Sequence, residues 1–195
     1  GNDVLSASGG NDRVYGGNGN DTLQGMSGDD YLEGGSGNDK LDGGFGSDLL
    51  FGEDGDDRLI GSDGADVLLG ASGKDTLIGH GGRNLLIGGG GGDQIRGGAD
   101  DDILIGATSI YDAPSITVEA ALKALLAEWS SPRKYGQRVE NLRTGAQLAA
   151  GHKLTAGGSV VINDGSVDTL LGGAGNDWFF AWSGLLAADK LDRVT

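Results

Sequence analysis

Among the residues of this 195-residue chain whose side chains could bind a metal or catalyse a reaction, the aspartates have the most regular spacing. They recur every nine positions from Asp3 to Asp102. Carboxylate oxygens are hard donors that suit a divalent cation, and a close row of like charges needs such a cation to become stable. The repeat therefore favours metal binding over acid–base catalysis. The row consists of Asp3, Asp12, Asp21, Asp30, Asp39, Asp48, Asp57, Asp66, Asp75, Asn84, Asp93 and Asp102, with one amide among the twelve positions.

Short strands and tight turns must position these aspartates. An aliphatic residue follows each one after two places, and the best copies, residues 16–24 and 34–42, read G-G-x-G-x-D-x-U-x, where U is aliphatic. Three residues around U form a short strand that points U inward and its neighbours outward. The six residues between strands are mostly Gly, Asn, Asp and Ser, which tolerate tight turns with positive φ. The chain therefore alternates short strands with glycine turns.

This nonapeptide resembles the RTX (repeats-in-toxin) calcium-binding family over residues 1–107, and again around Asp168 and Asp177. The resemblance implies an all-β solenoid, a right-handed parallel β-roll in which two nonapeptides make one coil and calcium ions lie in the turns. Aspartates one coil apart then stack along two edges at about 4.7–4.9 Å. A metal-free solenoid with a hydrophilic edge is the alternative.

The same resemblance implies several calcium ions, held by the aspartates, Asn84 and the carbonyls of turn glycines. We expect the best-formed sites between about Gly16 and Asp57, and weaker ones where Asn84 and Asp100 depart from the pattern. Asp164, Asp168 and Asp177 are further candidates in the returning repeat. The candidate carbonyl donors are Gly17, Gly19, Gly28, Gly35, Gly37, Gly44, Gly46, Gly55, Gly64 and Gly73.

One predicted sheet turns apolar on its outward side after the first coils. A soluble monomer does not normally expose such a patch, and the next segment offers a cover. Apolar residues at helical spacing predict a helix over 118–129, capped by Thr117, that lies across the patch. Ser131-Pro132 predicts the start of a second helix that ends at Leu142, with Tyr135, Val139 and Leu142 inward. The patch comprises Leu49, Phe51, Val67, Leu69, Leu85, Ile87, Ile103 and Ile105.

Two alternatives remain for the helices and the apolar patch. The helices could bind a partner, and an uncovered patch could join two copies of the chain in a dimer.

The chain is expected to divide into a β-roll of twelve nonapeptides at 1–107, a helical insert at 108–150, and returning repeats with a C-terminal cap at 151–195. A strand at 160–162 leads back into the repeat. Trp178, Phe179, Phe180 and Trp182 are expected to cap the open end of the roll, with carbohydrate stacking as the alternative.

Composition limits the partners. The net charge of −15 argues against nucleic acids and anionic membranes. The absence of cysteine excludes disulfides and thiolate sites. With 41 glycines and one core aliphatic per nine residues, folding must depend largely on metal binding. No signal peptide or membrane span is predicted, and the start inside a repeat suggests part of a larger secreted polypeptide.

No catalytic motif accompanies the repeats, so we expect no enzyme activity from this chain. The leading hypothesis is a calcium-binding module of a secreted bacterial protein, either extracellular or at the cell surface. The resemblance implies type I secretion, with folding on calcium outside the cell in support of a larger protein. The alternatives are an extracellular adhesion or ligand-binding module, and the non-catalytic C-terminal part of a secreted hydrolase.

Overall fold

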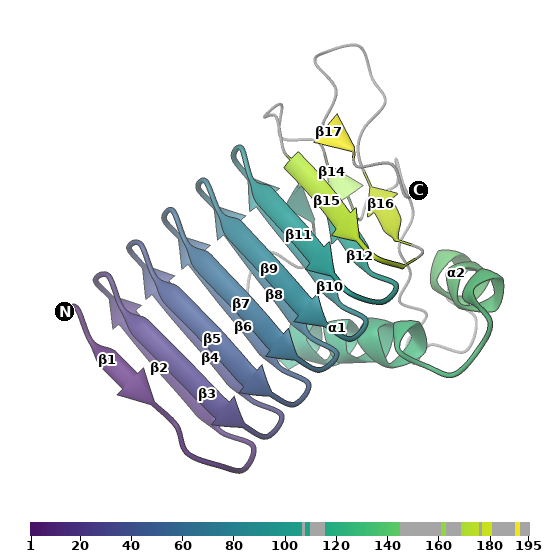
Figure 1. The fold of residues 1–195 in the computed structure, drawn as a ribbon. Coiled ribbons are helices and arrows are strands. Elements are labelled where there is room, and N and C mark those ends of the chain that lie inside the picture. The colour runs from purple at the N-terminus through teal and green to yellow at the C-terminus, as the bar shows by residue number, and fades with distance from the viewer. Residues whose placement is uncertain are drawn as a thin grey trace.

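The chain winds into a parallel β-solenoid built from two facing sheets (Figure 1). The computed structural model describes residues 1–106, 108–109, 116–144, 161–162, 169–175, 177–180 and 190–191. Each coil gives one strand to each sheet, and partners are one coil apart: Leu23 pairs with Leu41, and Leu41 with Leu59. The predicted parallel roll with 18 residues per coil is therefore confirmed.

The strands alternate between the two sheets along the chain. The eight-stranded sheet, called sheet A, contains β1 (Val4–Ser6), β3 (Thr22–Ser27), β5 (Lys40–Phe45), β7 (Arg58–Asp63), β9 (Thr76–Gly81), β11 (Gln94–Gly98), β15 (Thr169–Gly173) and β17 (Lys190–Leu191). The seven-stranded sheet, called sheet B, contains β2 (Arg13–Asn18), β4 (Tyr31–Ser36), β6 (Leu49–Asp54), β8 (Val67–Ser72), β10 (Leu85–Gly90), β12 (Ile103–Ile105) and β16 (Trp178–Phe180).

The core between the sheets is a thin layer of single aliphatic residues, one from each strand. From Leu23 to Leu104 these side chains are at most 1% exposed, while Leu5 and Val14 in the first coil are only partly buried. The layer holds the two sheets together, but it leaves the turns at both edges to be stabilised by other contacts.

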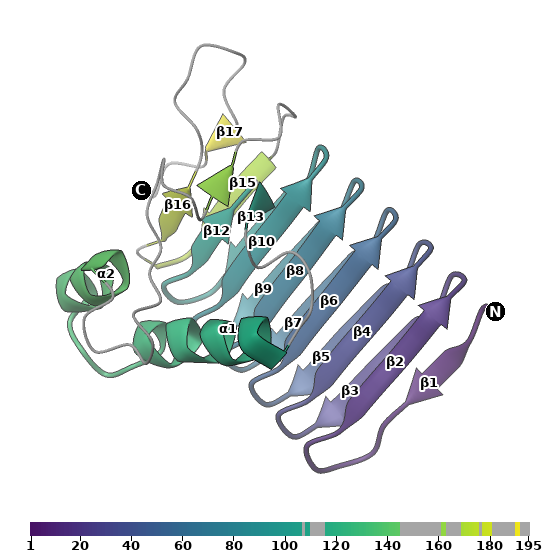
Figure 2. The same cartoon turned by 180° about the vertical axis from the view of Figure 1, so that it is seen from behind.

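A second core lies on the outer face of sheet B, where helix α1 (Ile116–Trp129) crosses the strands (Figure 2). The whole predicted apolar patch, from Leu49 to Ile105, is at most 2% exposed. Ala121, Leu122, Leu125, Leu126 and Trp129 of α1 cover it. The predicted helix position is confirmed, and the condition for a dimer through this face, an uncovered patch, is not met.

The helix boundaries differ from prediction. Helix α1 begins at Ile116, so Thr117 lies within its first turn rather than capping it. Helix α2 (Tyr135–Thr144) begins three residues after Pro132. Arg83 binds the Ser131 carbonyl at 3.2 Å, so the connection after α1 bends toward the roll instead of coiling. Tyr135 and Leu142 do face inward, whereas the Val139 side chain lies outside the described residues.

The chain leaves and re-enters the roll next to a two-stranded antiparallel sheet, β13 (Thr108–Ser109) with β14 (Val161–Ile162). Strand β14 matches the strand predicted at 160–162. Strands β15 and β16 then extend the two sheets in register: Ile95 pairs with Leu170, and Leu104 with Phe179. Trp182 and the side chains of Trp178, Phe179 and Phe180 lie outside the described residues, so the aromatic cap stays a prediction.

Candidate metal centre

The glycine turns form the two long edges of the roll, and each turn ends in the repeating aspartate. Edge 1 leads into sheet A and contains the turns 16–21, 34–39, 52–57, 70–75 and 88–93. Edge 2 leads into sheet B and contains the turns 7–12, 25–30, 43–48, 61–66, 79–84, 97–102 and 172–177. The predicted stacking of aspartates 18 positions apart places them in one row along each edge.

Hydrogen bonds link the aspartates of each row into an inner ladder. The backbone N–H of Asp21 donates to Oδ1 of Asp39 at 2.7 Å, and the backbone N–H of Asp39 donates to Oδ1 of Asp57 at 2.8 Å. Edge 2 repeats the pattern up to the backbone N–H of Asp102, which donates to Oδ1 of Asp177 at 2.9 Å. One oxygen of each carboxylate therefore stabilises the neighbouring coil.

The second carboxylate oxygen, Oδ2, is buried and accepts no hydrogen bond from any described residue. This holds for Asp12, Asp21, Asp30, Asp39, Asp48, Asp57, Asp66, Asp75 and Asp102. The oxygen lies over the first glycine of its own turn, where a methyl group on Gly16 would come within 2.6 Å of Asp21 Oδ2. A buried carboxylate oxygen without a partner is costly. Each turn therefore calls for a cation or a proton.

The pKa values of the carboxyl groups show this cost. Burial raises the pKa of Asp57, Asp66 and Asp102 to about 8, although the backbone N–H bonds to these carboxylates oppose the shift. Burial likewise raises the pKa of Asp48 and Asp75 to about 6. Without a metal ion, several of these carboxyl groups would hold a proton near neutral pH.

The turn carbonyls supply the other oxygen donors. The carbonyls of Gly19, Gly37 and Gly55 each face the equivalent glycine of the next coil, so they point along the roll into the space between stacked turns. The carbonyl of Gly17 points the same way, toward Gly35. On edge 2, the carbonyls of Gly28 and Gly46 do likewise. The predicted carbonyl donors thus line the same gaps as the carboxylates.

This donor set fits calcium. It consists of carboxylate and carbonyl oxygens, and calcium takes six to eight such ligands in a flexible shell. No group of three or more His, Cys, Asp or Glu side chains gathers at metal-binding distance in the described part of the chain. Carbonyls must therefore supply much of any coordination shell. A bound calcium ion would supply the positive charge that the rows of buried oxygens lack.

A family model decides the relationship. The model described as RTX calcium-binding nonapeptide repeat matches residues 1–23, 15–50, 42–77, 51–86, 78–108 and 163–184, more than half of the chain. This chain belongs to the RTX calcium-binding nonapeptide repeat family. Searches against curated proteins and against solved structures returned no match.

RTX nonapeptides bind calcium, and the buried aspartate rows of this RTX chain are suited to that ion. The roll itself is a non-catalytic structural module. The matched repeats stop near Thr108 and resume at residue 163, so the helices arise from an excursion out of the RTX pattern. Neither described helix has the length and apolarity needed to span a bilayer.

The predicted calcium ligands differ in burial. The eight aspartates from Asp21 to Asp93 on the two edges, together with Asp102, are buried, whereas Asp3 is exposed and Asp12 is intermediate. Asp177 continues edge 2 through its bond with Asp102, although 75 positions separate the two residues. Asp164 and Asp168 lie outside the described residues. The assignment of individual residues as calcium ligands stays a prediction.

Sequence reasoning missed an outer ladder in this RTX roll, formed by the residue immediately before each aspartate. The Asn20 side chain accepts the backbone N–H of Asn38 at 3.0 Å, and Asn38 in turn accepts that of Asp56 at 3.1 Å. Asp56 extends the ladder to the backbone N–H of Lys74. The recurrence of Asn or Asp one place before the repeating aspartate, 18 positions apart, is a signal that could have revealed it.

A clamp between edge 2 and the helices was also missed. The Asp101 carboxylate binds the buried Arg138 of α2, and its backbone carbonyl accepts the Trp129 indole N–H at 2.7 Å. The Arg138 guanidinium lies 4.9 Å from the Trp129 ring centroid. Arg83 adds a second cation, 3.7 Å from the Asp101 carboxylate. We call Arg83, Asp101, Trp129 and Arg138 the helix clamp.

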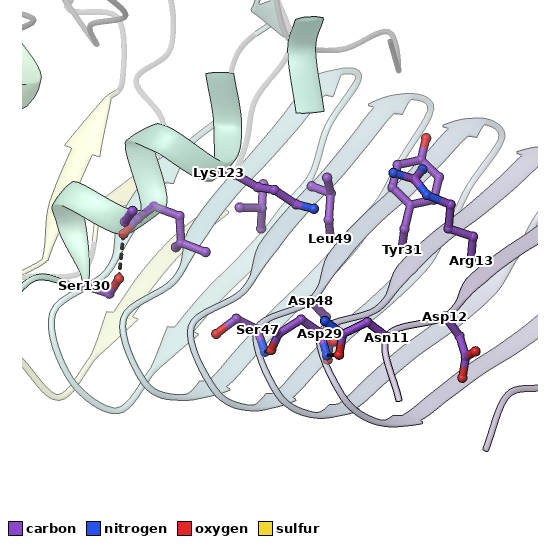
Figure 3. Close-up of a pocket in the computed structure, with 13 residues that line it drawn as sticks. Asn11, Asp12, Arg13, Asp29, Tyr31, Ser47, Asp48, Leu49, Lys123 and Ser130 are labelled. Carbon is purple, nitrogen blue, oxygen red and sulfur yellow. Dashed lines mark hydrogen bonds between the residues drawn. The ribbon is translucent and has the colours of Figure 1, made fainter. Parts of the chain in front are cut away.

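A recess of about 510 Å³ separates α1 from the first turns of edge 2 (Figure 3). Asn11, Asp29 and Ser47 of the outer ladder line one side, and Lys123 of α1 lines the other. Lys123 and Arg13 both pair with Glu119, at 2.8 and 2.7 Å. The Arg13 pair fastens α1 to β2, whereas the Lys123 pair lies within α1, so the recess reflects how the helix is anchored above the strands.

Proposed function

We propose that this RTX chain is a calcium-responsive module that stays unfolded at low calcium and folds outside the cell, where it supports the secretion and stability of a larger bacterial protein. The observation that carries the proposal is the row of buried aspartate Oδ2 atoms that accept no hydrogen bond from the described residues. Folding without calcium would bury these charges uncompensated, so calcium binding and folding are coupled.

The ligands in this proposal are the aspartates of both edges with the turn carbonyls. The six aspartates combine burial with turns that keep the first and fourth glycines of the repeat: Asp21, Asp39 and Asp57 on edge 1, and Asp30, Asp48 and Asp66 on edge 2. Sites built in this way have the modest affinities of extracellular calcium modules, about 10⁻⁴–10⁻³ M. Cytosolic calcium lies far below this range, so the chain would stay unfolded before export.

Far-UV circular dichroism during a calcium titration tests the coupling, with magnesium as the control. We expect a cooperative gain of β signal with calcium, a much weaker response to magnesium, and sedimentation as a compact monomer. A full β signal in chelator would contradict calcium-coupled folding. Protease sensitivity of the chain inside a producing bacterium, compared with resistance in calcium-containing medium, tests the location of folding.

A further inference from the structure

Asn84, the only amide in the aspartate rows from Asp3 to Asp102, keeps both inner-ladder bonds of edge 2. Its Oδ1 accepts the backbone N–H of Asp66 at 2.9 Å, and its own backbone N–H donates to Asp102 Oδ1 at 2.8 Å. Because Oδ1 must accept, the orientation of the amide is fixed, and Nδ2 takes the place that Oδ2 has in the aspartates.

The position of Nδ2 matches that of the buried oxygens. A methyl group on Gly79 would come within 2.5 Å of Asn84 Nδ2, just as a methyl group on Gly25 would come within 2.5 Å of Asp30 Oδ2. Nδ2, however, donates hydrogen bonds. It reaches the Gly82 carbonyl at 3.2 Å and, at the longer distance of 3.5 Å, the Gly81 carbonyl. Gly82 is the repeat equivalent of the candidate calcium donors Gly28, Gly46 and Gly64.

We propose that Asn84 makes the turn 79–84 independent of metal, so that the calcium row of edge 2 is interrupted at this turn. The amide N–H groups take over the role of the cation, because they satisfy a carbonyl oxygen and add no negative charge. The inference deepens the proposed function and rests on it. It divides edge 2 into a calcium-dependent part up to and including Asp66 and a separate pair, Asp102 with Asp177.

The surroundings of the turn support a metal-free state. Arg83 belongs to the same turn, and its Nη1 donates to the Ser130 and Ser131 carbonyls at 3.4 and 3.2 Å, beyond the end of α1. Its guanidinium also lies 3.7 Å from the Asp101 carboxylate, so a cation of the chain itself already serves this part of edge 2. The helix therefore contacts the roll at the turn that needs no metal ion.

The test is the number of calcium ions bound per chain, measured by equilibrium dialysis at saturating calcium, for wild type and Asn84→Asp. The variant restores a carboxylate in an intact turn, so we expect it to gain at least one ion. Asp75→Asn on edge 1 is the matched control, and it should lose at least one ion.

Asn84→Ala separates the two roles of the amide. It should leave the calcium count unchanged and raise the calcium concentration at the midpoint of folding, since it removes the amide bonds to Gly82 and to the Asp66 backbone N–H without adding a ligand. An unchanged calcium count in Asn84→Asp, with a calcium-loaded wild type, overturns this inference alone. So does an unchanged calcium midpoint of folding in Asn84→Ala. A wild type that binds no calcium overturns the proposed function, and the inference with it.

Discussion

Edges 1 and 2 repeat the same turns, but their carboxylates have different neighbours. Edge 1 carries an unbroken row from Asp21 to Asp93, and the helix clamp takes none of its residues from these turns. Edge 2 contains Asn84, and the helix clamp grips its turns 79–84 and 97–102. One nonapeptide pattern therefore serves two modes of stabilisation. Calcium alone would compensate the buried carboxylates of edge 1, whereas amide and guanidinium groups donate hydrogen bonds to part of edge 2.

The sheets show the same division. From β6 to β12, sheet B is buried on both faces, with Leu69 and Ile87 under α1 and Leu68 and Leu86 in the inner core. Sheet A keeps exposed cations such as Lys40 and Arg58 on its outer face, next to each other in the ladder. The apolar cover on sheet B thus lies beside the edge that depends less on calcium.

The largest expected effect is the pH dependence of the metal-free chain. Burial raises the pKa of Asp57, Asp66 and Asp102 to about 8, above the ordinary value of about 4. Protonation of these groups therefore stabilises the fold, fully below pH 4, and the stabilisation is lost as the pH rises through 8. In calcium-free buffer, the β signal of far-UV circular dichroism should therefore fall from pH 5 to pH 9. A flat or rising profile would contradict the buried rows.

With calcium present the dependence should reverse, because protons compete with the ion for the same carboxylates. Apparent calcium affinity should fall from pH 9 to pH 6 in dialysis against buffered calcium. Calcium binding that ignores pH in this range would show that these aspartates are not the ligands.

The next largest effect concerns the helix clamp. Arg138→Met should destabilise the chain by about 3 kcal/mol, because it leaves the Asp101 carboxylate without its buried cation. Calcium stoichiometry should stay unchanged, since the clamp lies outside the candidate coordination shell. Arg133→Met is the control: Arg133 is a half-exposed partner of Glu128, and its removal should cost less than about 1 kcal/mol. If urea unfolding shows the same loss of free energy of unfolding in both variants, the helix clamp contributes no more than an ordinary surface ion pair.

The smallest effect concerns the backbone of edge 1. Ala71 has a φ of 78°, in the left-handed region that disfavours side chains. Ala71→Gly should stabilise the calcium-loaded chain by about 1 kcal/mol. Ala65→Gly on edge 2 should destabilise it instead, since Ala65 is not among the residues with positive φ and packs beneath the helix. A loss of stability in Ala71→Gly would show that the left-handed backbone at Ala71 does not strain the fold.

The sequence sufficed for the roll, since the nine-residue period determines the strands, the turns and the inward aliphatic residues. It also located the helix cover, because Leu49 and Phe51 differ visibly from Arg13 and Tyr15 at equivalent positions. These features repeat along the chain, so their pattern can be recognised from a single sequence.

Contacts that occur once could not be predicted in this way. Arg138 looks like a surface residue of an amphipathic helix, yet it is 1% exposed because Asp101 and Trp129 lie opposite it. Pro132 suggested a helix start, but the Arg83 bond to Ser131 holds the connection in a bend. Asn84 looked like a weakened ligand, and only its hydrogen bonds show an amide donating to turn carbonyls.

Hydrogen exchange resolved by peptide, with and without calcium, tests most directly whether the buried rows need the ion. We expect the turns 34–39 and 52–57 of edge 1 to exchange rapidly in chelator and to become protected as calcium is added. Strong protection of the edge 1 turns in chelator would contradict the account.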